Sequence, residues 1–278
     1  MFRLVYHECI KTFLKKRTYL GFVILLVVIP LIEIAVKIEG ARFSSGFLRS
    51  LQQDFFFVGN LFNGWIVSHW IMNSLWVHIP ILISFVAGDQ LAGEATAGTY
   101  RLILIRPVSR TRIFFSKYLT TAVYTIVFVV FLGILSVGLA LILMGSGQLL
   151  VWDSGFLILP SSDVAWRFFA AYIFAAWSML TVSSIAFFFS SFVENAIGPI
   201  IATMGVLIVL LLVSVMPLEF FESIRPYIFT TYINIWQKVF ADPVQWPEIL
   251  EGVTWLGGYS AAMVGGAWLI FVRKDILS

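Results

Sequence analysis

Long runs of hydrophobic residues, separated by short polar segments, extend along the whole chain. The hydrocarbon core of a bilayer is about 30 Å thick, and a helix needs about 20 mostly apolar residues to cross it. Runs of this length predict six transmembrane helices, each bounded by charged residues, Pro or Gly, at residues 19–36, 60–87, 118–144, 165–189, 198–216 and 253–272. The pattern therefore predicts an all-α membrane protein in which residues 1–278 form a single domain.

The second run is the longest, with 28 residues between 60 and 87. At 1.5 Å per residue a straight helix of this length would measure about 42 Å. We therefore expect it to tilt, to project beyond the hydrocarbon, or to kink near Pro80.

The first 18 residues have helical periodicity, but they are too few and too charged to cross a membrane. This pattern predicts an interfacial helix, which either contacts a partner or only anchors the chain. The first long run follows it without a small-residue cleavage site, so we expect that run to be retained. One face of the interfacial helix is apolar and the opposite face is basic: Phe2, Val5, Tyr6, Cys9, Ile10, Phe13 and Leu14 against Arg3, His7, Lys11 and Lys15.

Composition agrees with a lipid environment. Hydrophobic residues make up 60% of the chain and charged residues 12%, against about 25% in soluble domains. The net charge of +3 is too small to indicate a nucleic-acid partner. The single cysteine, Cys9, excludes an intrachain disulfide bond.

The basic residues predict the orientation. If both ends are cytoplasmic, 12 of the 18 Lys and Arg residues lie in cytoplasmic segments, and ten acidic residues lie on the other side. Cytoplasmic loops carry an excess of Lys and Arg. We therefore expect a multi-pass protein of the inner (plasma) membrane with both termini in the cytoplasm.

The segment between the second and third runs, residues 88–117, has an ordered pattern as well as positive charge. It contains Glu94, then Gly98-Thr99, a short apolar turn, Arg106-Pro107 and, at the head of the next run, Lys117. This order closely resembles the signature of ABC-2-type transporter permeases. The alternative is a basic stop-transfer segment that fixes topology and touches only lipid headgroups.

The resemblance implies that residues 88–117 form a cytoplasmic coupling segment, with a coupling helix that docks on an ABC ATP-binding subunit. It also implies a second permease, either another copy or a homologue. ATP and Mg would be bound by the ATP-binding partner, since this chain has no Gly-x-x-x-x-Gly-Lys-[Ser/Thr] loop and is not expected to be an enzyme itself. The residues implied in docking are Glu94, Gly98, Thr99, Arg101, Arg106, Pro107 and Arg110. Replacing Glu94 or Arg106 is expected to uncouple or dissociate the ATPase.

The residues of this segment suit such a role physically. Gly98 permits a break in the backbone, Thr99 can cap the following turn, and Pro107 stops it. The apolar residues between Arg101 and Arg106 could form a wedge for a partner's groove.

Residues 217–252, before the last run, mix aromatic and charged side chains. This pattern is typical of amphipathic or re-entrant helical material at the outer interface. The segment either closes the outer end of a transport path or forms an interfacial belt.

A few ionisable or amide side chains lie within or beside the apolar runs, where such groups are costly and often functional. They are candidates for lining a pathway, although polar contacts between packed helices would also explain them. A metal site is not predicted, because three or four converging ligands are missing from the pattern. The candidates are Glu33, His69, Asn73 and His78, with Glu194 and Asn195 in the turn before the fifth run.

Three functions are compatible with these features. The first is the permease subunit of an ATP-driven exporter of a hydrophobic or amphiphilic substrate. The second is a mechanotransmitting or signalling subunit that uses a partner ATPase without moving a solute. The third, a membrane-embedded enzyme, has the least support, because no paired carboxylates or nucleophile motif occur at membrane depth.

Overall fold

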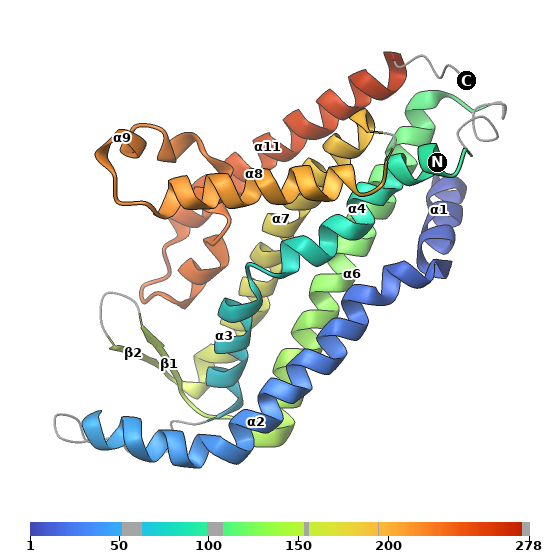
Figure 1. The fold of residues 1–278 in the computed structure, drawn as a ribbon. Helices are drawn as coiled ribbons and strands as arrows, with labels where there is room; N and C mark the ends of the chain where they lie inside the picture. Colours follow the sequence, from blue (N-terminus) through green and yellow to red (C-terminus); the bar gives the residue numbers. More distant parts are fainter. Residues whose placement is uncertain (52–62, 99–107, 153–155, 194, 274–278) are drawn as a thin grey trace.

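The chain forms a bundle of long, mutually inclined helices with a small hairpin at one end (Figure 1). This computed structural model describes residues 1–51, 63–98, 108–152, 156–193 and 195–273, with the backbone alone for 40–51, 152 and 156. The longer helices are α1 (Phe2–Leu14), α2 (Leu20–Leu51), α3 (Gly64–Leu75), α4 (Ile79–Thr96), α6 (Arg110–Met144), α7 (Ser161–Phe192), α8 (Gly198–Val215) and α11 (Trp246–Arg273). Short helical turns join them: η1 (Lys16–Tyr19), α9 (Glu219–Glu222), η2 (Arg225–Tyr227), α10 (Phe229–Tyr232) and η3 (Ile235–Phe240).

Five of the described helices are long and apolar enough to cross a membrane, and a sixth span results if α3 and α4 count as one. The predicted helical membrane protein is therefore confirmed at this level. α3 and α4 meet at an angle of 54° across residues 76–78, which confirms the kink expected near Pro80. Pro80 lies in the first turn of α4. In the first turn of a helix the N–H groups have no partner within the helix, so the missing N–H of Pro80 costs no hydrogen bond. In a continuous helix from α3 to α4, its ring would clash with the preceding turn.

The start of α3 is joined to the end of α6. Asn63 caps α3, because its Oδ1 accepts from the backbone N–H of Trp65 at 3.0 Å, and its Nδ2 donates to the carbonyl of Gln148 at 2.7 Å. Gly145 has a φ of +73°, a left-handed conformation that ends α6, and its carbonyl accepts from the N–H of Gly64 at 2.8 Å. These bonds fix two helix ends that are far apart in sequence.

A two-stranded antiparallel hairpin follows α6, and this small element was not expected from the sequence. β1 (Leu149–Trp152) pairs with β2 (Phe156–Leu159), with Leu149 opposite Leu159. Both of those leucines are buried in the main core. Strands of four apolar residues show no alternation of apolar and polar positions, so periodicity could not distinguish them from an irregular loop.

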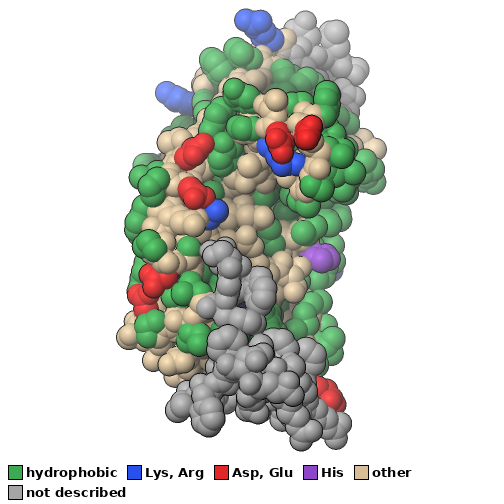
Figure 2. Space-filling view, turned by 90° about the vertical axis from the view of Figure 1, so that its left-hand side faces the viewer, with side chains coloured by type: hydrophobic (Ala, Val, Ile, Leu, Met, Phe, Trp, Pro, Cys, Tyr) green, Lys and Arg blue, Asp and Glu red, His purple; other side chains and the backbone are tan. Residues whose placement is uncertain are grey.

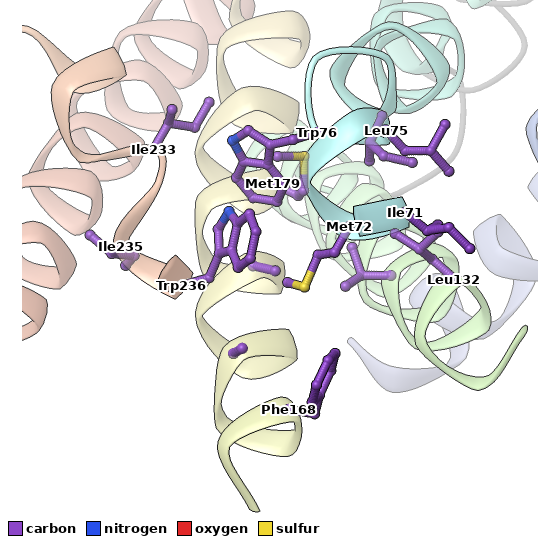
Figure 3. Packing of buried hydrophobic residues seen from close by; sticks show 14 of the residues in the cluster. Ile71, Met72, Leu75, Trp76, Leu132, Phe168, Met179, Ile233, Ile235 and Trp236 are labelled. Carbon is purple, nitrogen blue, oxygen red and sulfur yellow. The ribbon is translucent and has the colours of Figure 1, made fainter. Parts of the chain in front are cut away.

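The main hydrophobic core lies between α3, α6 and α7, and the outer segment, residues 217–252, contributes to it. Figure 3 shows Trp236 of η3 beside Trp76, with Met179 of α7 nearby, and the two indole rings have centroids 5.3 Å apart. Trp236 is fully buried. The outer segment is thus built of short helical turns that insert apolar side chains among the long helices.

The two ends of the bundle differ. The N-terminus, the end of α4, the start of α6 and the end of α11 lie together at what we call the terminal end, and β1, β2 and the start of α3 lie at the opposite, hairpin end (Figure 1). On the face shown in Figure 2, hydrophobic side chains are widespread and charged side chains occur in small, separated groups. That distribution suits helices surrounded by lipid.

Candidate functional site

Two buried carboxylates on the last turns of α4 organise the terminal end. Asp89 and Glu94 are each less than a tenth exposed, although both lie on a helix that ends at the surface. Buried charges are stable only when they are paired. Each is paired here, and we call the set of residues involved the charge cluster: Glu8, Lys11, Lys15, Arg17, Asp89, Glu94 and Lys117.

Lys117 of α6 is the centre of the charge cluster. Its side chain is 1% exposed, and its Nζ lies 3.0 Å from Oε1 of Glu94 and 2.8 Å from Oε2 of Glu8. Lys11 of α1 pairs with the same oxygen of Glu94. Three helices that are separate in sequence therefore share one set of charges.

A second part of the charge cluster holds the connection between α1 and α2. Asp89 lies 3.0 Å from Nζ of Lys15 and 2.6 Å from Nη1 of Arg17. Beside it, Nε2 of Gln90 donates to the hydroxyl of Thr12 at 3.1 Å. The basic face of α1 thus contacts α4, which goes beyond the interfacial helix expected from the sequence.

The opposite face of α1 is apolar and largely exposed. Phe2, Tyr6, Ile10 and Leu14, four residues apart, are all exposed. A helix with one apolar exposed stripe and one charged face is typical of a membrane interface. The arrangement therefore suits a helix lying against lipid on one side and against α4 and α6 on the other.

The sequence-predicted docking residues are only partly described. Thr99, Arg101, Arg106 and Pro107 lie outside the described residues. Gly98 ends α4 with a φ of +64°, and its N–H donates to the carbonyl of Ala95 at 3.0 Å, so the expected backbone break is confirmed.

Glu94 and Arg110 are engaged within the chain. Glu94 faces the charge cluster, so its carboxylate is placed to hold α4 against α1 and α6. Nη1 of Arg110 donates to the carbonyl of Val272 at 3.1 Å, near the end of α11. A cation there also suits the negative end of the helix dipole. The terminal end of α11 is therefore connected to the start of α6.

A buried serine joins α7 to α4 just before the charge cluster. Oγ of Ser190 donates to the carbonyl of Gly88 at 2.5 Å and accepts from the N–H groups of Leu91 and Ala92 at 3.1 and 2.9 Å. A Cβ on Gly88 would lie 3.1 Å from the side chain of Pro199, at the start of α8. α4 is thus held closely by α7 and α8, so a displacement of its end would reach both helices.

The predicted pathway residues separate into different places. Glu33 of α2 is fully buried, and its carboxylate oxygens have no hydrogen-bond partner among the described residues. His78 is exposed at the bend between α3 and α4, and its Nδ1 lies 3.2 Å from the carbonyl of Ser74. Oδ1 of Asn195 accepts from the N–H of Ile197 in the same turn, and Glu194 lies outside the described residues.

His69 and Asn73, by contrast, lie together in a pocket of about 180 Å³ near the hairpin end. We call it the outer polar pocket. Nε2 of Gln237 donates to Oδ1 of Asn73 at 2.7 Å, which connects α3 to η3. The described residues that line this pocket are His69, Asn73, Val151, Gln237, Lys238, Phe240, Ala241 and Gln245.

Arg167 of α7 fixes the wall of the outer polar pocket. Its buried guanidinium donates to the carbonyls of Val239 and Ala241 at 2.9 and 2.6 Å, and its Nε donates to Asp163 at 2.6 Å. Arg167 is not among the candidate residues that the sequence pattern suggests. The sequence does contain a signal for this role. Arg167 lies in the first turns of an apolar helix, four residues after Asp163, and a charge at such a position in a membrane must be paired.

A larger apolar groove of about 870 Å³ lies between α3, α6 and α7. Aromatic rings separate it from the outer polar pocket. Phe168, which lines the groove, has its ring centroid 5.1 Å from that of Phe240 and 5.0 Å from that of Trp65. The polar and apolar cavities therefore share one aromatic partition.

Tyr232 of α10 hydrogen-bonds to Glu251, near the start of α11. Its hydroxyl has one proton, which Oε1 of Glu251 at 3.2 Å and the carbonyl of Pro226 at 2.9 Å share as acceptors. Burial, together with the neighbouring Glu251, raises the pKa of Tyr232 above its usual value. The contact with Glu251 joins the outer segment to α11.

Comparisons with known proteins give two similarities. A family model described as "Protein of unknown function (DUF2705)" matches residues 53–277. The uncharacterized protein YhcI of Bacillus subtilis (strain 168) is 30% identical over 117 residues, which are 40% of this chain and 37% of that protein. The match thus spans little more than a third of the length of that relative.

Proposed function

The chain belongs to the DUF2705 family, and we propose that it is the membrane-spanning permease subunit of an ATP-driven ABC transporter that exports a hydrophobic or amphiphilic substrate. One observation carries this proposal. The segment that resembles the ABC-2 coupling region, residues 88–117, includes the end of α4, and that helix end is joined to α1 and α6 by the charge cluster.

The proposed topology has six transmembrane spans, with α3 and α4 forming the second, and with both termini and residues 88–117 in the cytoplasm. Two features support it. Both termini lie at the same end of the bundle (Figure 1), as an even number of spans requires. Most Lys and Arg residues fall in segments at this end, as expected for the cytoplasmic side of an inner (plasma) membrane.

The proposed coupling uses helices as levers. An ATP-binding subunit would contact the segment around Arg106, and closure of that subunit on ATP would displace the segment. α4 and α6 continue directly from the two ends of the segment, so they would move with it. α1 would follow because Lys11 and Glu8 are bound to Glu94 and Lys117. In this mechanism Glu94 and Arg110 are positioning residues, and Arg101 and Arg106 are the residues that contact the partner.

Co-purification tests the docking step. The chain would be co-expressed with the product of a neighbouring reading frame that carries a P-loop, and isolated in mild detergent. We expect the two proteins to co-purify and Arg106→Glu to lower the recovered ATPase about tenfold. Lys238→Glu, at the hairpin end, is the matched control and should leave recovery unchanged. Equal behaviour of the two variants, or the absence of any retained ATPase, would refute the docking assignment.

Proteoliposomes containing the complex test the transport step. An exporter should show ATP hydrolysis that an amphiphilic substrate stimulates, together with movement of that substrate. Stimulated hydrolysis without any movement would replace export by the mechanotransmitting function. Turnover of a substrate by the chain alone would point to an enzyme instead.

A further inference from the structure

We propose that the outer polar pocket binds an uncharged, hydroxyl-bearing group, such as a sugar ring, either free or as the headgroup of a glycolipid. This inference deepens the proposed function by naming the substrate class, although binding itself requires neither the ATPase nor transport. Four properties of the pocket carry it: its amide lining, its charge balance, its aromatic wall and its rigid support.

The first property is a set of amide groups that have unused hydrogen-bonding positions. Gln237 donates to Asn73, and Nδ2 of Asn73 donates to the carbonyl of His69 at 2.9 Å, so each amide still keeps one or more donor or acceptor positions. Oε1 of Gln245 is buried and has no hydrogen-bond partner among the described residues. Buried acceptors are nearly always satisfied, so an unpaired one at the wall of a pocket suggests that a ligand supplies the donor. A hydroxyl group can do this and can also accept from the neighbouring amides.

The second property is charge balance. Lys238 is the cation at the pocket, and its Nζ lies 2.7 Å from Oε2 of Glu248. Of the described residues that line the pocket, none carries a carboxylate. A cationic ligand would therefore meet no counter-charge, and an anionic ligand would have to compete with Glu248. The lining suits a neutral ligand best.

The third property is an aromatic wall. Phe240 and His69 meet edge to face with their ring centroids 5.0 Å apart, and both line the pocket. Small-molecule sites combine apolar walls with a few well-placed polar groups. The C–H face of a sugar ring fits an aromatic wall while its hydroxyl groups reach the amides. The volume of about 180 Å³ corresponds to about six waters at ~30 Å³ each, enough for one such ring.

The fourth property is support from buried groups. Arg167 holds the carbonyls of Val239 and Ala241, and Trp236 anchors η3 in the core. The backbone of η3, which carries Gln237, is therefore held in place, which lowers the entropic cost of binding. The apolar groove beyond Phe168 lies on the other side of the aromatic partition, where the chains of a bound glycolipid would be close to the membrane helices.

Equilibrium binding to the purified full-length chain in phosphatidylcholine nanodiscs tests the proposal. The probes are methyl glucoside, methyl glucuronide and a glucosyl diacylglycerol, measured by titration calorimetry. We expect the glucoside to bind in the millimolar range or better and the glucuronide, which adds a carboxylate, to bind about tenfold more weakly. Binding of the glucoside but not of the glycolipid would mean that the pocket recognises a free sugar. Binding of the glycolipid but not of the glucoside would mean that the lipid part is also required.

Two variants locate the binding in the pocket. Gln245→Leu and Asn73→Leu should each weaken binding about tenfold, because each removes hydrogen bonds to the ligand. Gln148→Leu, an exposed amide at the same end outside the pocket, is the matched control and should bind normally.

Several results would overturn the proposal. They are no binding of any neutral probe, tighter binding of the glucuronide that is lost in Lys238→Met, or equal binding by Gln148→Leu and the two pocket variants. The ligand series on the unchanged chain decides the matter even if a variant fails to fold. Binding without ATP-driven movement in the reconstituted complex would leave this inference standing and remove the export function.

Discussion

The two ends of the bundle bury polar groups in different ways. At the terminal end, Lys117 and Glu94 pair across helices, so each bond joins segments that are distant in sequence. At the hairpin end, Arg167 pairs mainly with Asp163, one turn away on its own helix, and donates to two backbone carbonyls, while Asp242 lies farther from it at 3.6 Å. Aromatic packing around Trp236 connects the segments there.

This difference has a mechanical consequence. Ion pairs between helices are discrete contacts that can break and re-form as helices move, whereas interlocked aromatic side chains resist displacement. The terminal end is therefore suited to transmit motion. The hairpin end is suited to keep the shape of a pocket.

The largest expected effect comes from Trp236→Ala, which tests whether packing holds the hairpin end. Removing this buried indole should lower the free energy of unfolding by about 3–5 kcal/mol, because the contacts are lost and a cavity remains. SDS titration in mixed micelles would measure it. Phe220→Ala, an exposed aromatic of the same segment, is the control and should change little. Equal effects would show that the outer segment is not anchored by its core contacts.

Lys117→Met tests the charge cluster directly. Breaking a buried ion pair by removing one partner costs about 3–5 kcal/mol, and we expect the low end because Lys11 still neutralises Glu94. A double-mutant cycle with Glu94→Gln should show a coupling energy of about 1–3 kcal/mol. Additive effects in the same unfolding assay would mean that the two residues do not act together.

Arg167→Lys tests whether the outer polar pocket depends on a planar guanidinium. A lysine keeps the charge but cannot reach both carbonyls and Asp163 at once, so we expect a loss of about 2 kcal/mol in stability. The pocket should also bind its ligand more weakly. Unchanged stability and binding would remove Arg167 from its supporting role.

Arg17→Ala should have the smallest effect. Arg17 is about half exposed, and surface pairs contribute about 0–1 kcal/mol and weaken as salt is added. We therefore expect a loss below about 1 kcal/mol at low ionic strength and almost none in high salt. Lys238→Ala at the hairpin end should behave similarly. A loss of stability as large as that of Lys117→Met would mean that the buried charge of Asp89 requires Arg17 as its partner.

Much of the architecture could be predicted from the chain alone. Runs of about 20 apolar residues identify membrane helices without knowledge of their packing, since each must satisfy its own backbone in lipid. Pro80 marked the bend and Gly98 the end of α4, because the restricted φ of proline and the left-handed conformation open to glycine are local properties. The hairpin could not be predicted, since its short strands depend on the core that covers Leu149 and Leu159.

The sites depended on tertiary structure to a greater degree. The sequence identified Glu94, His69 and Asn73 as unusual in their surroundings, but spacing along one helix does not reveal partners on another. Lys117 meets Glu94 across 23 residues of sequence, and Asn73 meets Gln237 across 164. By itself the sequence thus determined which segments are long and apolar enough to cross a membrane and where they bend or stop, because those are local consequences of hydrophobicity and backbone freedom. The packing of the helices decided which polar groups became a charge cluster and which became a pocket, because only burial against distant segments makes pairing obligatory.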